Sequence, residues 1–309
     1  MTRRAGAWGA LLFAGALAPL VARAVDASDW LARMHGALHE LDYSGALVVQ
    51  RADRMQVMQL FHAAGHPERE RLLSLDGPPR ELVRSGTTLV WRAAERPAVA
   101  WTADAPRSLM PLLPDAMPAW MADNYRAALY GEAHVAGYDA VMVELSPRDR
   151  YRYGYRLWLE RRSALPLRTQ LLGPQGEPLG QCTFARLQIG RRPARSDLDI
   201  AAAAAVAASP PPAAASPHWR IVDPPPGFRL AESLAEGADS TAQHLLFSDG
   251  LASVSIYIER APVALPPGRT THGALSVYSA ERDGERVTAL GNVPEATLER
   301  MVRSAERVR

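Results

Sequence analysis

The sequence contains no lysine, so all 35 of its basic residues are arginine. This absence excludes the lysine that forms a Schiff base in some enzymes and the lysine of a phosphate-binding P-loop. The 33 acidic residues nearly balance the arginines and leave a formal net charge of +2, which is not typical of a nucleic-acid-binding protein. Cys182 is the only cysteine, so an intramolecular disulfide is excluded and we expect a buried structural thiol.

Catalytic motifs are missing as well. The sequence has no G-x-S-x-G, G-x-G-x-x-G or G-x-x-x-x-G-K-[ST] motif, and its acidic residues are scattered through turns. Two histidine pairs have i, i+4 spacing, His35 with His39 and His62 with His66, but no glutamate follows His35 as a zinc-binding HExxH motif requires. We therefore expect no enzyme, no metal and no cofactor, and we expect these histidines on the surface.

The N-terminus has the features of a secretory signal peptide. Arg3 and Arg4 provide a positive start, residues 7–20 are apolar, and Ala22-Arg23-Ala24 supplies the small-x-small cleavage pattern. The apolar run is too short for a membrane-spanning helix, which needs about 20 residues. We predict cleavage after residue 24 and a soluble mature protein in the periplasm. Residues 1–24 include three arginines and no acidic residue, so cleavage lowers the net charge from +2 to −1.

An alanine- and proline-rich segment divides the mature chain. Residues 201–217 read AAAAAVAASPPPAAASP, a composition typical of a tether between folded parts. We place the linker at residues 194–217, a large domain at residues 25–193 and a small domain at residues 218–309.

The large domain starts with one helix and continues with strands. Apolar residues three or four positions apart predict a helix that Ser28 caps and whose buried face includes Leu31, Met34 and Leu38. Short segments of β pattern follow at residues 43–51, 55–62, 70–75, 81–83, 88–92, 98–102, 133–135, 140–145, 153–160, 167–172 and 179–189. This order predicts a strongly curved antiparallel sheet, or half-open β-barrel, with helices on its concave side.

The last 90 or so residues predict a smaller α+β domain. Hairpins are expected to turn at Asp249-Gly250 and at Asp283-Gly284, because Asp-Gly pairs favour tight turns. Pro294 is expected to open a C-terminal helix. The whole chain is therefore predicted to be an α+β protein of two domains.

Two stretches are candidate binding surfaces. The first is rich in arginine and forms either the solvated face of a strand pair or a patch for acidic protein segments or lipid phosphates. Its residues are Arg148, Arg150, Arg152, Arg156, Arg161 and Arg162. The second is apolar and either packs in the core or lines an acyl-chain cavity on the curved sheet. Its residues are Leu109, Met110, Leu112, Leu113, Met117, Trp120 and Met121.

Several segments resemble the RseB/MucB family, in the same order along the chain. In the large domain they are Leu41-Asp-Tyr-Ser-Gly45, Ser74-Leu-Asp-Gly-Pro-Pro-Arg-Glu81, Tyr155-Arg-Leu-Trp-Leu-Glu160 and Leu165-Pro-Leu-Arg168. In the small domain they are Leu246-Phe-Ser-Asp-Gly-Leu251 and Leu290-Gly-Asn-Val-Pro294. The resemblance covers nearly all of the mature chain, with the linker in the expected place.

The resemblance implies a periplasmic negative regulator of the envelope-stress response, with a large domain similar to the lipoprotein carriers LolA and LolB. Family members bind the periplasmic domain of a transmembrane anti-sigma factor, shield it from proteolysis and release it on sensing lipopolysaccharide or lipoprotein. We thus expect an anti-sigma factor as partner and acyl chains as a further ligand, with no nucleic acid and no membrane span, and we leave a homo-oligomer open.

The alternative is a periplasmic lipid or lipoprotein carrier without a regulatory partner. Such a carrier would need neither the second domain nor the tether. A periplasmic hydrolase is disfavoured because the catalytic motifs are missing.

Overall fold

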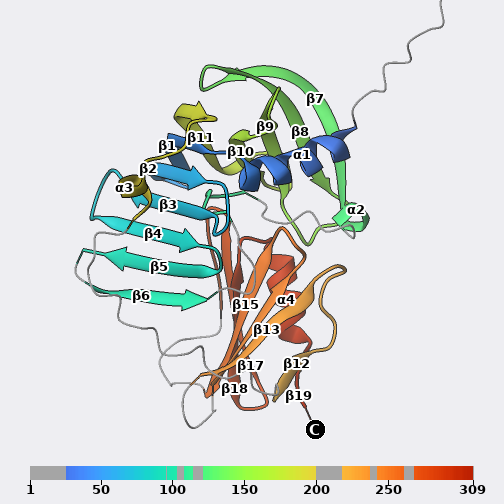
Figure 1. Ribbon diagram of the computed structural model, residues 1–309. Coiled ribbons are helices and arrows are strands. Elements are labelled where there is room, and N and C mark those ends of the chain that lie inside the picture. Colours follow the sequence, from blue (N-terminus) through green and yellow to red (C-terminus); the bar gives the residue numbers. More distant parts are fainter. Residues whose placement is uncertain are drawn as a thin grey trace, which may run out of the picture.

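The computed structural model describes residues 26–94, 96–102, 108–113, 121–199, 218–236, 242–260 and 268–308. Within these residues the chain forms two large antiparallel sheets, each with its own apolar core (Figure 1). The predicted signal peptide and residues 200–217 of the predicted linker lie outside the described residues.

The large domain is built on one antiparallel sheet in the order β6-β5-β4-β3-β2-β1-β11-β10-β9-β8-β7. Its first half comprises β1 (Tyr43–Arg51), β2 (Arg54–Ala63), β3 (Arg69–Ser74), β4 (Arg80–Ser85), β5 (Thr88–Ala93) and β6 (Arg96–Thr102). Its second half comprises β7 (Tyr125–Val135), β8 (Tyr138–Pro147), β9 (Gly154–Glu160), β10 (Pro166–Leu172) and β11 (Pro178–Ile189). β1 pairs with β2 and with β11 and so joins the halves.

The sheet is curved and open. Its end strands, β6 and β7, are not paired with each other among the described residues. Helix α1 (Ala27–Glu40) crosses the concave side beneath β7, β8 and β9 (Figure 1). The predicted fold class, α+β with two domains and a strongly curved, half-open antiparallel sheet, is confirmed.

Helix α1 begins two residues earlier than its sequence suggests. Asp26 is the N-cap, and its amide donates to the carboxylate of Asp29 over 3.4 Å, so Ser28 lies inside the first turn and does not cap the helix. The predicted apolar face is confirmed, because Leu31, Met34 and Leu38 are all buried.

Strand β7 is much longer than the predicted segment at residues 133–135. It begins at Tyr125, and most of its side chains up to residue 134 are partly or fully exposed. An edge strand with two largely solvated faces lacks the alternation of apolar and polar residues on which the prediction depended. The bulge at Gly131, which has φ of +124°, interrupts the pattern further.

Part of the predicted linker is docked on the large domain. Residues Arg195–Leu198 form the short helix α3, in which Leu198 is buried. Asp199 pairs with Arg69, and Arg71 Nη1 donates to the carbonyl of Asp197 over 3.2 Å. Residues 195–199 of the predicted linker therefore contact the large domain, and the bounds of the linker stay a prediction.

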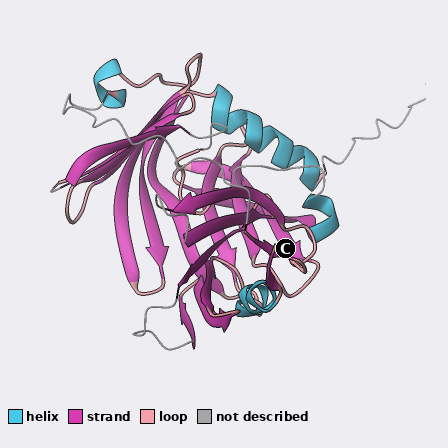
Figure 2. Ribbon diagram, turned by 90° about the horizontal axis from the view of Figure 1, so that it is seen from below, coloured by secondary structure: helices cyan, strands magenta, loops and turns pink. Residues whose placement is uncertain are grey.

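The small domain has a sheet in the order β13-β14-β15-β18-β17-β16 and a helix, α4 (Glu295–Arg303), that packs on β17 and β18 (Figure 2). Its strands are β13 (Arg229–Glu236), β14 (Ala242–Ser248), β15 (Ser253–Arg260), β16 (Gly268–His272), β17 (Leu275–Arg282) and β18 (Glu285–Gly291). A separate pair, β12 (Trp219–Ile221) and β19 (Ala305–Arg307), joins the two ends of the domain. Both predicted hairpins and the helix behind Pro294 are confirmed.

Candidate functional site

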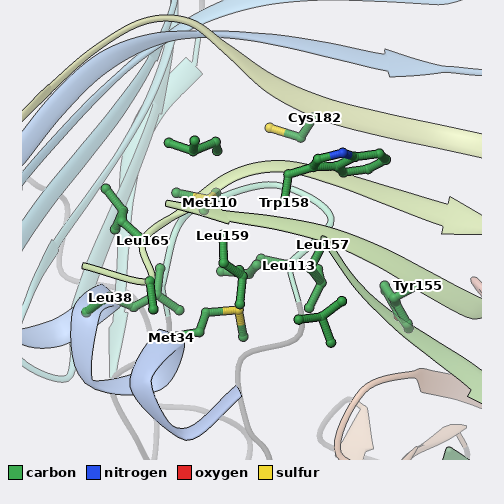
Figure 3. Close-up of a cluster of buried hydrophobic side chains, with 14 of the residues drawn as sticks. Met34, Leu38, Met110, Leu113, Tyr155, Leu157, Trp158, Leu159, Leu165 and Cys182 are labelled. Carbon is green, nitrogen blue, oxygen red and sulfur yellow. The ribbon is translucent and has the colours of Figure 1, made fainter. Parts of the chain in front are cut away.

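Segment 108–113 enters the concave interior of the large sheet. Met110 and Leu113 are buried in the large-domain core, near Met34 and Leu38 of α1 and Leu157 of β9 (Figure 3). The remaining predicted residues of this segment, Leu109 and Leu112, are half-buried against the same cluster. The structure thus brings four of the predicted apolar residues together, and their contact with an acyl chain stays a prediction.

The other three residues of the predicted apolar stretch are not placed in the same way. Met117 and Trp120 lie outside the described residues. Met121 begins the short helix α2 (Met121–Asn124), but its side chain is not among those described.

A buried ion pair holds the start of segment 108–113. The carboxylate of Glu70 accepts hydrogen bonds from the backbone amide of Leu109, at 2.8 Å, and from Ser108 Oγ, at 3.2 Å. Arg84 Nη2 lies 3.1 Å from the same carboxylate, and the side chains of Glu70 and Arg84 are both fully buried. Because a buried charge is stable only when paired and hydrogen-bonded, this segment is part of what makes the ion pair tolerable.

Glu68 extends this ion pair into a network with two histidines. Its carboxylate lies 2.8 Å from His62 Nε2 and 3.1 Å from His39 Nδ1, and it also pairs with Arg84. Burial alone would raise the pKa of Glu68, but the hydrogen bonds from His39, His62 and Arg84 hold it well below its usual range. The same hydrogen bond raises the pKa of His39, against the opposing effect of burial.

All four histidines were expected on the surface, and His35 and His66 are exposed. His39 is half-buried, and the expectation is wrong for His62, which is fully buried and whose ring stacks on Tyr43 with 4.5 Å between the centroids. The rings of His35 and His39 do meet on α1, with 4.8 Å between their centroids, whereas His62 shares with His39 only the carboxylate of Glu68. Within the described residues, no group of three or more His, Cys, Asp or Glu side chains is arranged to hold a metal ion.

The structure gives the six predicted arginines different neighbours. Arg156 pairs with Glu144 at 2.7 Å, and Arg161 pairs with Glu132. Arg148 Nε donates to backbone carbonyls near α2, whereas Arg150 and Arg162 are exposed. Arg152 is buried. Burial removes Arg152 from the surface, and the role of the stretch toward an acidic partner stays a prediction.

Arg152 connects the two domains. Its guanidinium lies 2.7 Å from Asp249 at the β14–β15 turn of the small domain, and both side chains are fully buried. It also pairs with Asp149 at 3.0 Å and donates to the carbonyl of Pro226. The hydroxyl of Tyr125 donates to the Asp249 carboxylate over 3.3 Å. Separating the two domains would leave two buried charges without their partners, so the pair favours this arrangement of the domains.

Helix α4 makes a second set of contacts across the same junction. Thr297 Oγ1 donates to the carbonyl of Tyr151 over 2.5 Å, and Arg300 Nη1 donates to the hydroxyl of Tyr151 over 3.0 Å. Nearby, the hydroxyl of Tyr155 donates to the carbonyl of Leu251 over 3.4 Å. The residues between β8 and β9 therefore contact both the β14–β15 turn and α4, and no sequence motif marked this junction.

Comparison with known proteins agrees with this two-domain arrangement. The MucB/RseB N-terminal domain matches residues 26–204, and the MucB/RseB C-terminal domain matches residues 213–306. The chain belongs to the MucB/RseB family. The sigma factor AlgU regulatory protein MucB of Pseudomonas aeruginosa is 33% identical over 306 residues, which cover 95% of each chain. The sigma-E factor regulatory protein RseB of Salmonella typhimurium is 26% identical and covers 89% of this chain and 88% of its own.

Solved MucB structures share the fold. A crystal structure of MucB in complex with MucA(peri) superimposes with a TM-score of 0.73 at 32% identity, covering 92% of this chain and 100% of that one. A complex structure of Pseudomonas aeruginosa MucA/MucB gives a TM-score of 0.75 at 31% identity, covering 92% and 99%. Among the residues described for this MucB/RseB family member, no helix is both long and apolar enough to cross a membrane.

Proposed function

We propose that this protein is a periplasmic negative regulator of the envelope-stress response, which binds the periplasmic segment of a membrane anti-sigma factor. The observation that carries this proposal is the match of both domains, in order, to a family whose relatives are named as sigma factor regulatory proteins. Related MucB chains have been solved in complex with MucA. The relatives are regulatory proteins, which favours a binding role over catalysis.

In this proposal, binding shields the anti-sigma segment from proteolysis. What supports a shielding role is that the two domains meet at a hydrogen-bonded junction, so a partner could contact both of them. A segment that contacts both domains would be covered over more of its length than one that contacts a single domain. Protease access to the segment would then depend on how the two domains are placed.

The second part of the proposal is release in response to lipopolysaccharide or lipoprotein. An acyl chain would enter the apolar interior where Met110 and Leu113 now pack, and segment 108–113 would have to move. If the anti-sigma segment prefers one conformation and the lipid the other, each ligand weakens the binding of the other to the same extent.

A pull-down tests both parts. The mature protein is incubated with the periplasmic segment of the anti-sigma factor from the same genome, with and without lipopolysaccharide fragments, and protease cleavage of the segment is followed. We expect binding and slower cleavage, both reversed by the lipid. Binding that is unaffected by lipid would remove the release step and leave the regulator role intact. Co-purified acyl chains without any binding of the segment would favour a lipid or lipoprotein carrier.

A further inference from the structure

Two clefts meet at the domain junction, one on each side of Arg150. The first has a volume of about 530 Å³, and both domains contribute to its walls. Its walls include Arg150 and Tyr151 of the large domain and Asp223, Ala296, Glu299, Arg300 and Arg303 of the small domain. The second has a volume of about 490 Å³ and is lined mainly by the large domain, with Pro294 from the small domain. Arg150 lines both clefts, so the two are adjacent, and together they are called the groove.

The first cleft has an excess of positive charge. Arg300 is neutralised by Asp223, at 2.6 Å, and Arg303 is neutralised by Glu299. Arg150 is exposed, and no carboxylate among the described residues lies within 4.0 Å of its guanidinium. Arginine binds carboxylates in bidentate geometry, and its unused donors here face a cleft.

Tyr151 contacts two of these arginines, one from each domain. Its ring has the guanidinium of Arg150 at 5.4 Å and that of Arg300 at 5.1 Å, measured from the ring centroid. Both arginines donate to its hydroxyl, at 3.5 Å and 3.0 Å, and these hydrogen bonds lower the pKa of Tyr151. The side chain thus keeps one arginine from each domain at the same cleft.

The second cleft is mainly apolar. Its walls include Leu145, Pro147, Leu172 and Pro174 together with glycine backbone. Two carboxylates also line it, but each is already paired: Glu144 with Arg156 at 2.7 Å, and Asp149 with Arg152 at 3.0 Å. What the cleft offers a ligand is therefore apolar contact and backbone hydrogen bonds.

We propose that this groove binds an extended acidic peptide, with a carboxylate side chain on Arg150 and an apolar side chain in the second cleft. The proposal rests on the proposed function, because the peptide would belong to the anti-sigma segment. A peptide fits better than an anionic lipid, because the second cleft, of about 490 Å³, has room for one or two side chains but not for several acyl chains.

Peptide binding measured on the full mature protein tests the groove. Fluorescence anisotropy with the labelled periplasmic segment of the anti-sigma factor gives its affinity for the wild type and for two variants. Arg150→Glu reverses the uncompensated charge, and Ala296→Glu adds a carboxylate to the first cleft. Glutamate in the first turn of α4 suits the helix dipole, so the second variant should fold. We expect each variant to bind about tenfold more weakly or worse.

Two further variants make the result specific. Arg186→Glu makes the same change of charge at an exposed arginine of β11 outside the groove, and binding should change less than about twofold. Arg162→Glu should behave likewise, because Arg162 lies beyond the far end of β9. An equal loss with Arg162→Glu would mean that the whole arginine stretch binds the partner, which overturns the groove.

The outcomes separate this inference from the proposed function. If the wild type does not bind the segment, the proposed function fails. If the wild type binds and Arg150→Glu binds equally well, the function stands and the groove is wrong. A last experiment measures binding of the wild type and of Arg150→Glu to vesicles that contain phosphatidylglycerol. If Arg150→Glu weakens vesicle binding and leaves peptide binding unchanged, the groove binds an anionic lipid and the peptide assignment is overturned.

Discussion

The contacts of Glu68 make the stability of the folded protein depend on pH. The pKa of His39 is raised above 6.5 by its hydrogen bond to Glu68, so the folded state is favoured by protonation of His39. That contribution to stability is fully present below pH 6.5 and is lost as the pH rises through the folded-state value. The pKa of Glu68 is lowered from 4.5, so its contribution is fully present above pH 4.5 and is lost progressively as the pH falls below that value. The two groups therefore act in separate pH ranges.

We predict that the free energy of unfolding falls as the pH rises above about 6.5, and that His39→Gln removes part of this fall. Glutamine can still donate to Glu68 but does not titrate. Urea unfolding at several pH values measures the effect. His134→Gln, at an exposed histidine, serves as the control and should keep the wild-type slope. Identical slopes for His39→Gln and the wild type would show that this hydrogen bond does not contribute to the pH dependence.

The labelling rate of Cys182 measures how accessible the core of the large domain is, and no cysteine has to be introduced for this measurement. Cys182 is 3% exposed, lies in the same core cluster as Met110, and burial raises its pKa to about 12. We predict that N-ethylmaleimide labels it slowly in the folded protein and quickly in urea, since the thiolate is the reactive form. Ser108→Ala removes a hydrogen bond to the buried carboxylate of Glu70, so labelling should become about tenfold faster.

The control for this experiment is Ser279→Ala, which breaks a 3.0 Å hydrogen bond to Thr288 in the small domain. Its labelling rate should match that of the wild type. If Ser108→Ala labels no faster than this control, movement of segment 108–113 does not expose Cys182, and the acyl-chain proposal loses its entry route.

At the scale of helices and strands, local sequence patterns predicted some elements correctly and missed others. Asp-Gly turns and Pro294 predicted hairpins and a helix correctly, because local turn chemistry depends on neighbouring residues only. Strand β7 was largely missed because an exposed edge strand has no buried face to impose a pattern. Glu70 could have been noticed, since it shares the buried face of β3 with Leu72, where a charged residue is unexpected.

Two glycines on neighbouring elements should respond in opposite ways to alanine. At Gly45 in β1 a Cβ would lie 2.3 Å from the carbonyl oxygen of Arg186 and 2.7 Å from the ring of Phe184. At Gly36 in α1 the nearest atom would be 3.8 Å away. We predict that Gly45→Ala destabilises the protein by roughly 1–3 kcal/mol or more. Gly36→Ala should stabilise it by up to about 1 kcal/mol, because alanine favours the helix.

Urea midpoints at unchanged m-values measure both effects. A stable Gly45→Ala variant would mean that β1 and β11 can separate locally at the bulge beside this residue, which the close pairing of the two strands argues against.

At the scale of the whole molecule, the domain junction is the feature that could not be predicted from the sequence. Arg152 and Asp249 are 97 positions apart, and neither lies in a motif that points to the other. Arg152 was grouped with its neighbours as a candidate surface residue, yet the fold buries it against a turn of the other domain. Such a contact depends on how two finished domains fit together, and local patterns do not contain that information. The same holds for the groove, whose walls come from both domains.

The junction predicts that the two domains stay associated when the tether is cut. A specific protease site introduced between residues 200 and 217 would separate them covalently, and the Arg152–Asp249 pair and the contacts of Tyr151 would remain. We expect the two fragments to co-elute in size-exclusion chromatography. Arg152→Met should separate them, because it leaves the Asp249 carboxylate buried without its cation, at a cost of about 3–5 kcal/mol.

Arg156→Met is the matched control, because its partner Glu144 belongs to the same domain, and its fragments should still co-elute. Separation of the wild-type fragments at micromolar concentration would mean that the tether, through its effective concentration, is what keeps the domains together. In that case a ligand could change the domain arrangement at little cost. Co-elution would mean instead that any ligand that moves the domains apart must supply the free energy of breaking a buried ion pair. That free energy is the least by which the ligand must bind the separated arrangement of the domains more tightly than the associated one.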